Sequence, residues 1–398
     1  MRLSGVATLA VLALWLVPLG TAHGEGAPRL EAAWKRFTET YRAAVARHGV
    51  VGSSLVLVHD GEVAARVTSG LADRETARPV DDDTIFHWAS ITKTLTGIAV
   101  LQLRDRGKLS LDDPVVKYLP ELRQVHDPFG DPSEITIRHV LSHSAGFRDP
   151  TWPWGGDKDW HPFEPTRWDQ VVAMFPYTEV LFPPGSRYSY SNPAVIFLGQ
   201  IIERLTGDDY EVYVDKNVLK PLEMHRSFFN RAPYHLVRHR SHSYFLDASG
   251  LREGRFDFDT GITTSNGGLN APLGDMAKYL GFLMGRDNRR EAYEGVLRRA
   301  SLEEMWRPVL PVREEPDGRV SIGLAFFLEH RGGLDLVAHS ASQNGFISHF
   351  YLHPPSRRGY IVVFNTEDTR EGEPTRKLDG EIRDELLRSV FPVLAGPP

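Results

Sequence analysis

The 398-residue chain contains no cysteine. This absence excludes disulfide bonds, thiolate metal sites and a cysteine nucleophile, and it excludes a bacterial lipoprotein anchor, which needs a cysteine at its cleavage site. It says little about the compartment, because an exported protein need not carry disulfides. The chain also has little net charge, with 46 Lys and Arg against 52 Asp and Glu. Nothing in this balance favours a nucleic-acid partner.

Several catalytic signatures are missing as well. There is no Gly-x-Ser-x-Gly elbow, which argues against an α/β-hydrolase. There is no His-Glu-x-x-His zinc helix and no phosphate-binding Gly-x-x-x-x-Gly-Lys loop. Of the 16 histidines, His139 and His143 have the i,i+4 spacing of a helical metal pair. We favour a structural role for this pair, and we expect no metal and no cofactor.

Long apolar runs are confined to the N-terminus. Arg2 precedes the apolar run Val6–Leu19, and small residues follow it, a pattern typical of a secretory signal peptide cleaved after Ala22 or Gly24. The run is shorter than the ~20 residues of a spanning helix, so a retained anchor is the less favoured alternative. We expect residues 1–24 to be removed, and residues 25–398 to form an exported, periplasmic or secreted domain without a stable membrane span.

The rest of the chain has ordinary globular composition, with 41% hydrophobic residues. A helix is predicted over Pro28–His48, and then a hairpin whose strands meet at Asp60-Gly61. Helical patterns dominate the middle of the chain, and strand patterns return near the C-terminus. The expected middle helices are Ile91–Arg106, Ile137–His143, Trp168–Phe175, Ala194–Leu205, Tyr210–Leu219 and Gly274–Met284. The expected late elements are the strands Gly323–Leu328, Leu334–His339, Phe346–Leu352 and Tyr360–Asn365, and the helix Lys377–Val390.

Strands at both ends with helices between them predict an α/β (α+β) fold. One antiparallel sheet would be built from both termini and flanked by helices, because a sheet must bury its apolar face. A large, mainly helical region would be inserted into it. We place the sheet region at about 28–85 and 310–398, and the helical region at about 86–309.

Ser90-Ile91-Thr92-Lys93 is the first candidate for chemistry. The helix predicted to start at Ser90 is apolar over much of its circumference, which is typical of a buried helix. Residues three apart share a helix face, so Lys93 would lie one turn below Ser90. A serine hydroxyl needs a group that accepts its proton, and a desolvated lysine can be that group. The alternative is a serine cap with a lysine that reaches outward to solvent.

Two further segments carry candidate groups. Tyr190-Ser191-Asn192 follows a rigid Pro-Pro-Gly loop and precedes a helix, so Tyr190 could relay a proton and Asn192 could hold a substrate carbonyl. Alternatively, Asn192 caps the next helix. The segment His339-Ser340-Ala341-Ser342 ends a predicted strand, whose edge could give a backbone N–H to an oxyanion hole. A lone histidine at a strand end is more often structural.

Taken together, Ser90-x-x-Lys93, Tyr190-x-Asn192 and His339-Ser340-Ala341 resemble the serine β-lactamase and penicillin-binding-protein superfamily. The order matches its class C-like branch, which includes esterases and D-amino-acid peptidases. Further segments are similar to that family, and the resemblance spans roughly residues 30–390. These segments are Ile135–Phe147, Gly267-Gly268-Leu269 and Asp275-Met276-Ala277.

The resemblance implies an acyl-enzyme mechanism. Ser90 would attack the acyl carbon, Lys93 would accept its proton, and Tyr190 would protonate the leaving group and activate the deacylating water. Asn192 would orient Lys93 and the substrate. The segment with His339 and Ser340 would support them, and His339 would interact with a substrate carboxylate or with Tyr190. The backbone N–H groups of Ser90 and Ser342 would form an oxyanion hole.

One departure concerns the pocket. The family's third motif usually ends in glycine, and the methyl group of Ala341 would narrow the site against a bulky β-lactam. The Trp-rich segment 149–168 could be a lid or apolar wall over the pocket, or a loop pinned by buried tryptophans. We treat these as equal alternatives.

Three functions follow as hypotheses. The first is an exported serine hydrolase of a small ester or amide. The second is a β-lactamase or D,D-peptidase acting on peptidoglycan-like substrates, although no class A Glu-x-x-Leu-Asn motif is evident. The third is a catalytically silent peptidoglycan- or ligand-binding module on a hydrolase scaffold.

Overall fold

A computed structural model describes residues 26–148, 165–254, 256, 259–315, 318–370 and 374–394. The predicted signal peptide and most of the Trp-rich segment lie outside these residues. Within them, no helix is long and apolar enough to cross a membrane.

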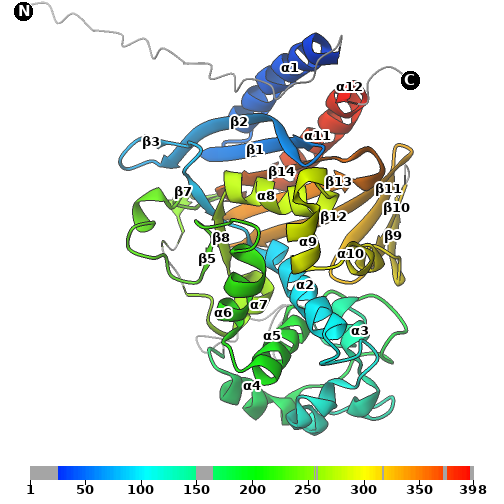
Figure 1. Ribbon diagram of the computed structural model, residues 1–398. Helices are drawn as coiled ribbons and strands as arrows, with labels where there is room; N and C mark the ends of the chain where they lie inside the picture. The colour runs from blue at the N-terminus through cyan, green and yellow to red at the C-terminus, as the bar shows by residue number, and fades with distance from the viewer. Residues whose placement is uncertain are drawn as a thin grey trace, which may run out of the picture.

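The centre of the fold is a nine-stranded sheet that both ends of the chain build (Figure 1). All its neighbouring strands are antiparallel. The N-terminal β1 pairs with the C-terminal β14, which joins the two halves of the chain. Across the sheet the strands are β3 (Arg78–Pro79), β2 (Glu62–Asp73), β1 (Gly52–His59), β14 (Arg358–Phe364), β13 (Phe346–His353), β12 (Leu334–Gln343), β11 (Phe327–Arg331), β10 (Gly318–Ile322) and β9 (Leu310–Glu315).

The predicted hairpin forms at the start of this sheet. Asp60 and Gly61 both have positive φ, 52° and 77°, as a tight turn between twisted strands requires. The strand predicted over Gly323–Leu328 is wrong in its first four residues. The chain turns there, with Ala325 at a φ of 62°, and β11 begins only at Phe327.

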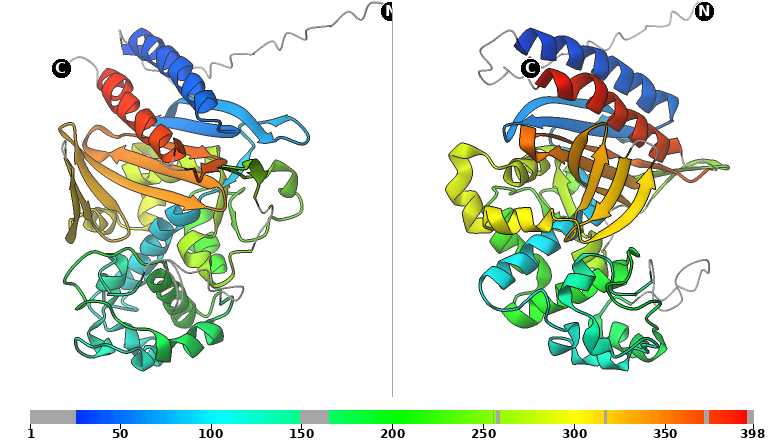
Figure 2. Two further views of the ribbon diagram at one scale, coloured as in Figure 1. Left: turned by 180° about the vertical axis from the view of Figure 1, so that it is seen from behind. Right: turned by 90° about the vertical axis from the view of Figure 1, so that its right-hand side faces the viewer.

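Helices from the two termini cover one face of the sheet (Figure 2). The N-terminal helix α1 (Gly26–Arg47) lies beside α11 (Pro374–Glu385), a π-helical turn (Leu386–Val390) and α12 (Phe391–Leu394). Phe37 and Tyr41 of α1 pack with Leu378 and Leu386 and with strand residues such as Val362 in one apolar cluster. This layer closes the face of the sheet that lies away from the helical region.

The other face packs against the inserted helical region, through a second and larger apolar cluster. Helix α8 lies directly against β1 and β14, and α2 runs from the sheet into the helical region (Figure 1). The helices of this region are α2 (Thr92–Asp105), α3 (Ile137–Leu141), α4 (Trp168–Met174), α5 (Asn192–Thr206), α6 (Tyr210–Val214), α7 (Thr264–Gly267), α8 (Leu273–Met284), α9 (Arg290–Val296) and α10 (Arg299–Met305).

Two small sheets complete the described part of the chain. β8 (Leu269–Pro272) pairs with β4 (Ile85–His87) and β5 (Phe228–Phe229), and so ties the segment before α2 to the segment before α8. β6 (Tyr244–Asp247) pairs with β7 (Gly250–Glu253) and, in parallel, with β15 (Thr366–Asp368). The predicted fold class, an antiparallel sheet from both termini with an inserted helical region, is confirmed.

Candidate active site

The turn that presents Ser90 is tightly held. Ala89 has a φ of 43°, which is uncommon for a residue other than glycine, so the backbone carries local strain where the serine is presented. The Trp88 indole donates to the carbonyl of Ala271 at 2.9 Å, and Thr92 Oγ1 donates to the Ala89 carbonyl at 2.6 Å. Ser90 lies in a short 3-10 turn (Ala89–Ile91), and α2 begins at Thr92, one residue after the start of the predicted helix Ile91–Arg106 and two residues after Ser90.

Lys93 is fully buried one turn below Ser90, with 1% of its surface exposed. Its Nζ lies 2.9 Å from Ser90 Oγ and 2.8 Å from the carbonyl oxygen of Asn266. The alternative of a lysine that reaches outward is wrong, because α2 is buried on all sides here and directs the side chain inward. An amine that donates one N–H to Asn266 can direct its lone pair at the serine hydroxyl.

Tyr190 completes the contact from a segment a hundred residues away. Its hydroxyl lies 3.0 Å from Ser90 Oγ, and Lys93 Nζ lies 5.0 Å from the centre of its ring. The structure thus brings the three predicted catalytic side chains into mutual contact. Their catalytic roles remain predictions.

Asn192 opens α5 but does not cap it. The cap is Ser191, whose Oγ accepts the N–H of Ala194 at 3.2 Å, so the alternative reading of Asn192 as the cap is wrong. Asn192 contributes its carbonyl oxygen, which accepts the side-chain amide of Asn266 at 3.1 Å. Its predicted role in orienting Lys93 stays a prediction.

Asn266 is a residue of the site that sequence reasoning missed. Its carbonyl accepts a hydrogen bond from Lys93 and its side chain donates to Asn192 at the start of α5, so it links two of the three candidate segments. It is buried at the end of α7, directly before the Gly267-Gly268 pair that the sequence singled out. The glycine pair was the feature of the nearby sequence that we singled out, and it does not indicate that the carbonyl of Asn266 contacts Lys93.

Strand β12 borders the site with alternating side chains. Val337 and Ala341 belong to the cluster on the helical side and Leu336 and Ala338 to the cluster on the outer side, so His339 faces the helical region. Ser340 and Ser342 face the other way, and Ser342 Oγ donates to Glu367 at 2.7 Å. Only their backbone can serve the site, as was predicted for Ser342. The pairing of β11 with β12 stops at Ala338, and the 3-10 turn of Ser90 contacts β12.

His339 is buried and electrically neutral in this setting. Burial, together with the neighbouring Lys93, lowers its pKa to about 3. Its Nδ1 lies 2.7 Å from the Ser340 carbonyl, which only a protonated Nδ1 can satisfy. The proton-free Nε2 is buried and has no hydrogen-bond partner among the described residues.

The beta-lactamase family model matches residues 37–383 of the chain. The chain belongs to the beta-lactamase family. Its members' fold agrees with the sheet and helical layers described above, and the segments that converge at Ser90 are those on which the resemblance to serine β-lactamases and penicillin-binding proteins was based.

Two curated relatives are similar over parts of the chain. Esterase EstB of Burkholderia gladioli is 34% identical over 216 residues, which cover 50% of this chain and 54% of the esterase. Protein flp of Staphylococcus aureus (strain COL) is 26% identical over 319 residues, which cover 79% of this chain and 60% of that protein. The chain thus spans less than two thirds of the length of either relative.

Solved structures agree with the family. The octameric penicillin-binding protein homologue from Pyrococcus abyssi superposes with a TM-score of 0.74 at 28% identity, covering 89% of this chain and 77% of that chain. The D-amino acid amidase of Ochrobactrum anthropi SV3 gives a TM-score of 0.72 at 22% identity, covering 91% and 99%. A class C β-lactamase mutant gives 0.72 at 16% identity, covering 92% and 99%. The last two likenesses show the fold alone.

His139 and His143, the pair with i,i+4 spacing, each use a ring nitrogen to accept a backbone hydrogen bond. His139 Nδ1 accepts the N–H of Thr136 at 3.3 Å, and His143 Nδ1 accepts that of Ser191 at 3.1 Å. In the part of the chain that the structure describes, no group of three or more metal-ligating side chains gathers.

Of the tryptophans in the segment 149–168, Trp152, Trp154 and Trp160 lie outside the described residues. Trp168 starts α4 and packs edge-on against Phe175 and Phe197, with ring centres 5.7 and 6.2 Å apart. For Trp168, the alternative of an anchor pinned to the helical region is therefore the correct one.

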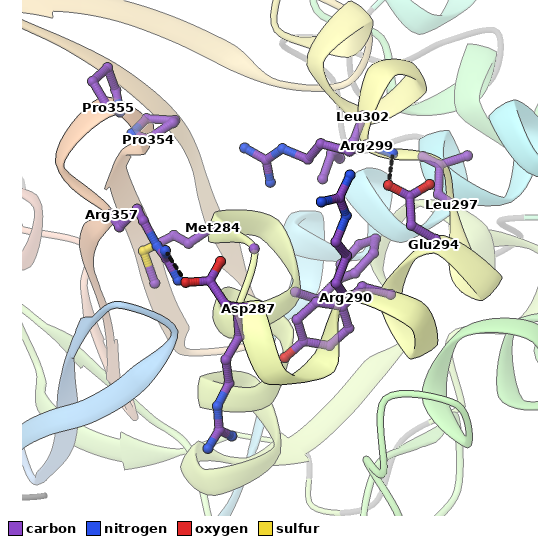
Figure 3. A pocket seen from close by; sticks show the side chains of 14 residues that line it. Met284, Asp287, Arg290, Glu294, Leu297, Arg299, Leu302, Pro354, Pro355 and Arg357 are labelled. Atoms are coloured by element: carbon purple, nitrogen blue, oxygen red, sulfur yellow. Dashed lines mark hydrogen bonds and ion pairs between the residues drawn. The ribbon is translucent and has the colours of Figure 1, made fainter.

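A pocket of about 340 Å³ lies away from this family site (Figure 3). It is formed by the end of α8, by α9 and α10, and by the turn between β13 and β14. Arg357 pairs there with Asp287 at 3.0 Å, and Arg299 donates to the Leu283 carbonyl at 2.6 Å. Neither Ser90, Lys93 nor Tyr190 lines this pocket.

Proposed function

We propose that this chain is an exported serine hydrolase that cleaves a small ester or amide through an acyl-enzyme on Ser90. The observation that carries the proposal is the double contact on Ser90 Oγ, from Lys93 Nζ at 2.9 Å and from the Tyr190 hydroxyl at 3.0 Å. A hydroxyl placed between an amine and a phenol has one group to take its proton and another to pass it on.

The steps follow from this geometry. Ser90 Oγ attacks the acyl carbon while its proton moves to Lys93 Nζ. The tetrahedral intermediate then collapses, and the leaving alkoxide or amine takes a proton from the Tyr190 hydroxyl, which Lys93 reprotonates. In deacylation a water gives its proton to the same pair and attacks the acyl carbon of the Ser90 ester. The second tetrahedral intermediate then collapses, the bond between Ser90 Oγ and the acyl carbon breaks, and Ser90 Oγ takes the proton back from the pair as the acid leaves. The backbone N–H groups of Ser90 and Ser342 would stabilise the oxyanion in both halves.

The charge of the site favours a neutral acyl group. A substrate carboxylate would be bound best by a cation on β12, but His339 is neutral and presents a bare Nε2. An unprotonated ring nitrogen repels a carboxylate and accepts a hydrogen bond from a neutral donor. Ala341 is buried on the same face of β12, where its methyl group would narrow the space for an acyl group. Both features favour small neutral esters or amides, and a relative named as an esterase supports this choice.

The test combines labelling with turnover. A serine-reactive phosphonate should add to one peptide, the one that contains Ser90, as mass spectrometry would show. Short-chain nitrophenyl esters should be hydrolysed, and Ser90→Ala should lose both properties. A label that persists in Ser90→Ala would refute the assignment.

A second candidate is a β-lactamase or D,D-peptidase, which the likeness to a penicillin-binding protein homologue at 28% identity favours. A chromogenic cephalosporin and D-amino amides, assayed beside the esters, separate the two. A higher kcat/KM on either of them than on any ester would favour this second candidate. Binding of such ligands with no turnover would instead favour a silent binding module.

Export is the remaining part of the proposal. It rests on the charged and apolar pattern of residues 1–24. N-terminal sequencing of the protein recovered from the periplasm or medium of a bacterial host should begin near residue 23 or 25. Full-length protein that stays in the cytoplasm would argue against it.

A further inference from the structure

His143 makes three contacts with Tyr190 and its two neighbours in the chain. Its backbone carbonyl accepts the N–H of Ser189 at 2.8 Å, and its Nδ1 accepts the N–H of Ser191 at 3.1 Å. These are the two residues on either side of Tyr190. In addition, the imidazole stacks on the Tyr190 ring, with centres 4.3 Å apart and planes inclined by 26°.

The segment that carries Tyr190 needs such support. Between Phe182 and Ser191 the chain forms no helix and no strand, so no regular hydrogen-bond ladder fixes the ring. The hydroxyl must nevertheless stay within hydrogen-bond distance of Ser90 Oγ. Contacts from His143 to both neighbours of Tyr190 supply this restraint from outside the segment.

His143 is itself rigidly placed. It lies in the turn after α3 with 2% of its surface exposed and a φ of 50°, a left-handed conformation that few residues adopt. Burial, with Lys93 and His339 nearby, holds the pKa of His143 well below its ordinary value. The ring is therefore neutral, with its proton on Nε2, and Nδ1 remains free to accept from Ser191.

We propose that His143 is the positioning residue for Tyr190: it holds the phenol against Ser90 by bracketing the backbone on both sides and by stacking on the ring. This inference rests on the proposed function, because it assigns Tyr190 a part in proton transfer. His143 does not touch the reacting atoms, so its effect on the rate passes entirely through Tyr190.

The chain offers variants that separate the contacts. His143→Asn keeps an acceptor near the position of Nδ1 and tolerates the left-handed backbone, but it loses the stacked ring. His143→Phe keeps a ring but leaves the buried N–H of Ser191 unpaired, and it strains the backbone. His139→Asn is the matched control: it makes the same change four residues earlier, on a ring that lies against Gly185 of the same loop but makes neither the bond to Ser191 nor the stacking on Tyr190.

The decisive experiment is a double-mutant cycle with Tyr190→Phe, measured on nitrophenyl esters. We expect His143→Asn to lower kcat by about 10- to 100-fold with little change in KM, because a small displacement of a proton-transfer group costs this much. In the Tyr190→Phe background, His143→Asn should lower kcat by less than about twofold. If the two residues acted independently, the full loss in kcat would appear in both backgrounds. His139→Asn should leave kcat unchanged.

An NMR measurement that needs no substrate tests the position of Tyr190 directly. The NOEs between the Tyr190 ring and the Lys93 side chain, whose Nζ lies 5.0 Å from the ring centre, should weaken in His143→Asn and persist in His139→Asn. If His143→Phe does not fold, the asparagine variant and this spectrum still decide. Wild-type kcat in His143→Asn, or an equal loss with and without the Tyr190 hydroxyl, would overturn the inference. Failure of the proposed function would show differently, as a wild-type protein that takes no phosphonate on Ser90.

Discussion

His339 and His349 lie on adjacent strands of one sheet, but on opposite faces. Both are buried, with 2% and 1% exposed. On the outer face, both ring nitrogens of His349 have a polar neighbour: Nδ1 lies against the carboxylate of Asp379 of α11 in an ion-pair contact, and Nε2 lies 2.8 Å from the Tyr360 hydroxyl. On the inner face, His339 uses one nitrogen, and Nε2 has no partner in the described part of the chain.

The difference between His349 and His339 separates contacts that stabilise the fold from groups that remain available to a substrate. The outer histidine ties a terminal helix to two strands and leaves no polar atom for a ligand. On the inner face, Nε2 of His339 is buried beside the site without a hydrogen-bond partner among the described residues, which costs stability and is common where a substrate is to complete the hydrogen bonds. Changes on the two faces should therefore affect different measurements.

The largest effect should come from the inner face. Removing the nucleophile with Ser90→Ala should lower kcat by roughly 10⁴-fold or more, and Lys93→Met should lower it by about 10²- to 10⁴-fold, because the proton acceptor is lost. Burst kinetics on nitrophenyl esters measure both. The melting temperature of Ser90→Ala should stay at the wild-type value, and a large drop would mean that the serine is structural.

A substitution on the outer face should lower the stability of the fold and leave the activity unchanged. His349→Ala removes a buried ring and leaves Asp379 and Tyr360 without their shared partner. The unfolding free energy should fall by about 2–4 kcal/mol, as for other buried polar groups that lose a partner along with packing. Urea unfolding measures this fall. Activity per folded molecule should remain that of the wild type, and loss of kcat at full folding would remove the distinction between the faces.

Low pH should destabilise the fold through the buried histidines of the inner face. Burial holds the pKa of His339 at about 3 and that of His87 at about 4, below the ordinary 6.5. Between these values and 6.5 the unfolded chain binds more protons than the folded one, so stability falls as the pH is lowered through this window. Each group contributes at most about 1.4 kcal/mol per pH unit.

Urea unfolding at pH 7.5, 6 and 5 measures this slope. His87→Gln should reduce the slope of stability against pH by up to one proton, because the pKa of His87 lies at about 4 in the folded chain. Equal slopes in wild type and His87→Gln would contradict the prediction.

The smallest effect concerns the wall of the pocket. Ala341→Gly removes a methyl group from β12 and should raise the kcat/KM for bulky acyl groups relative to acetyl by a few-fold. A glycine within a strand should also cost roughly 0.5–1 kcal/mol of stability. A series of nitrophenyl esters with acyl chains of increasing size gives the ratio, and an unchanged ratio would show that the methyl group does not limit the site.

Much of the fold could be predicted because it depends on local pattern. The terminal helix, the Asp60-Gly61 hairpin and the helices α2, α5 and α8 follow apolar periodicity to within two residues. The strands β9 and β10 at the open edge escaped prediction, since Pro311 and several charges interrupt their pattern. The parallel pairing of β15 with β6 escaped as well, because its partners are more than a hundred residues apart.

The sequence by itself determined that Lys93 lies one turn from Ser90 on a buried helix, because three-residue spacing on a helix fixes which side chains meet. The meeting of Ser90 with Tyr190 was predicted from a family resemblance, and the fold was needed to bring the two within 3.0 Å. Only the tertiary structure decided that His143 stacks on that tyrosine while His139 caps a helix, and that Asn266 holds the lysine. The physical reason is that spacing governs contacts within one element, whereas contacts between distant segments depend on how the sheet and the helical region pack.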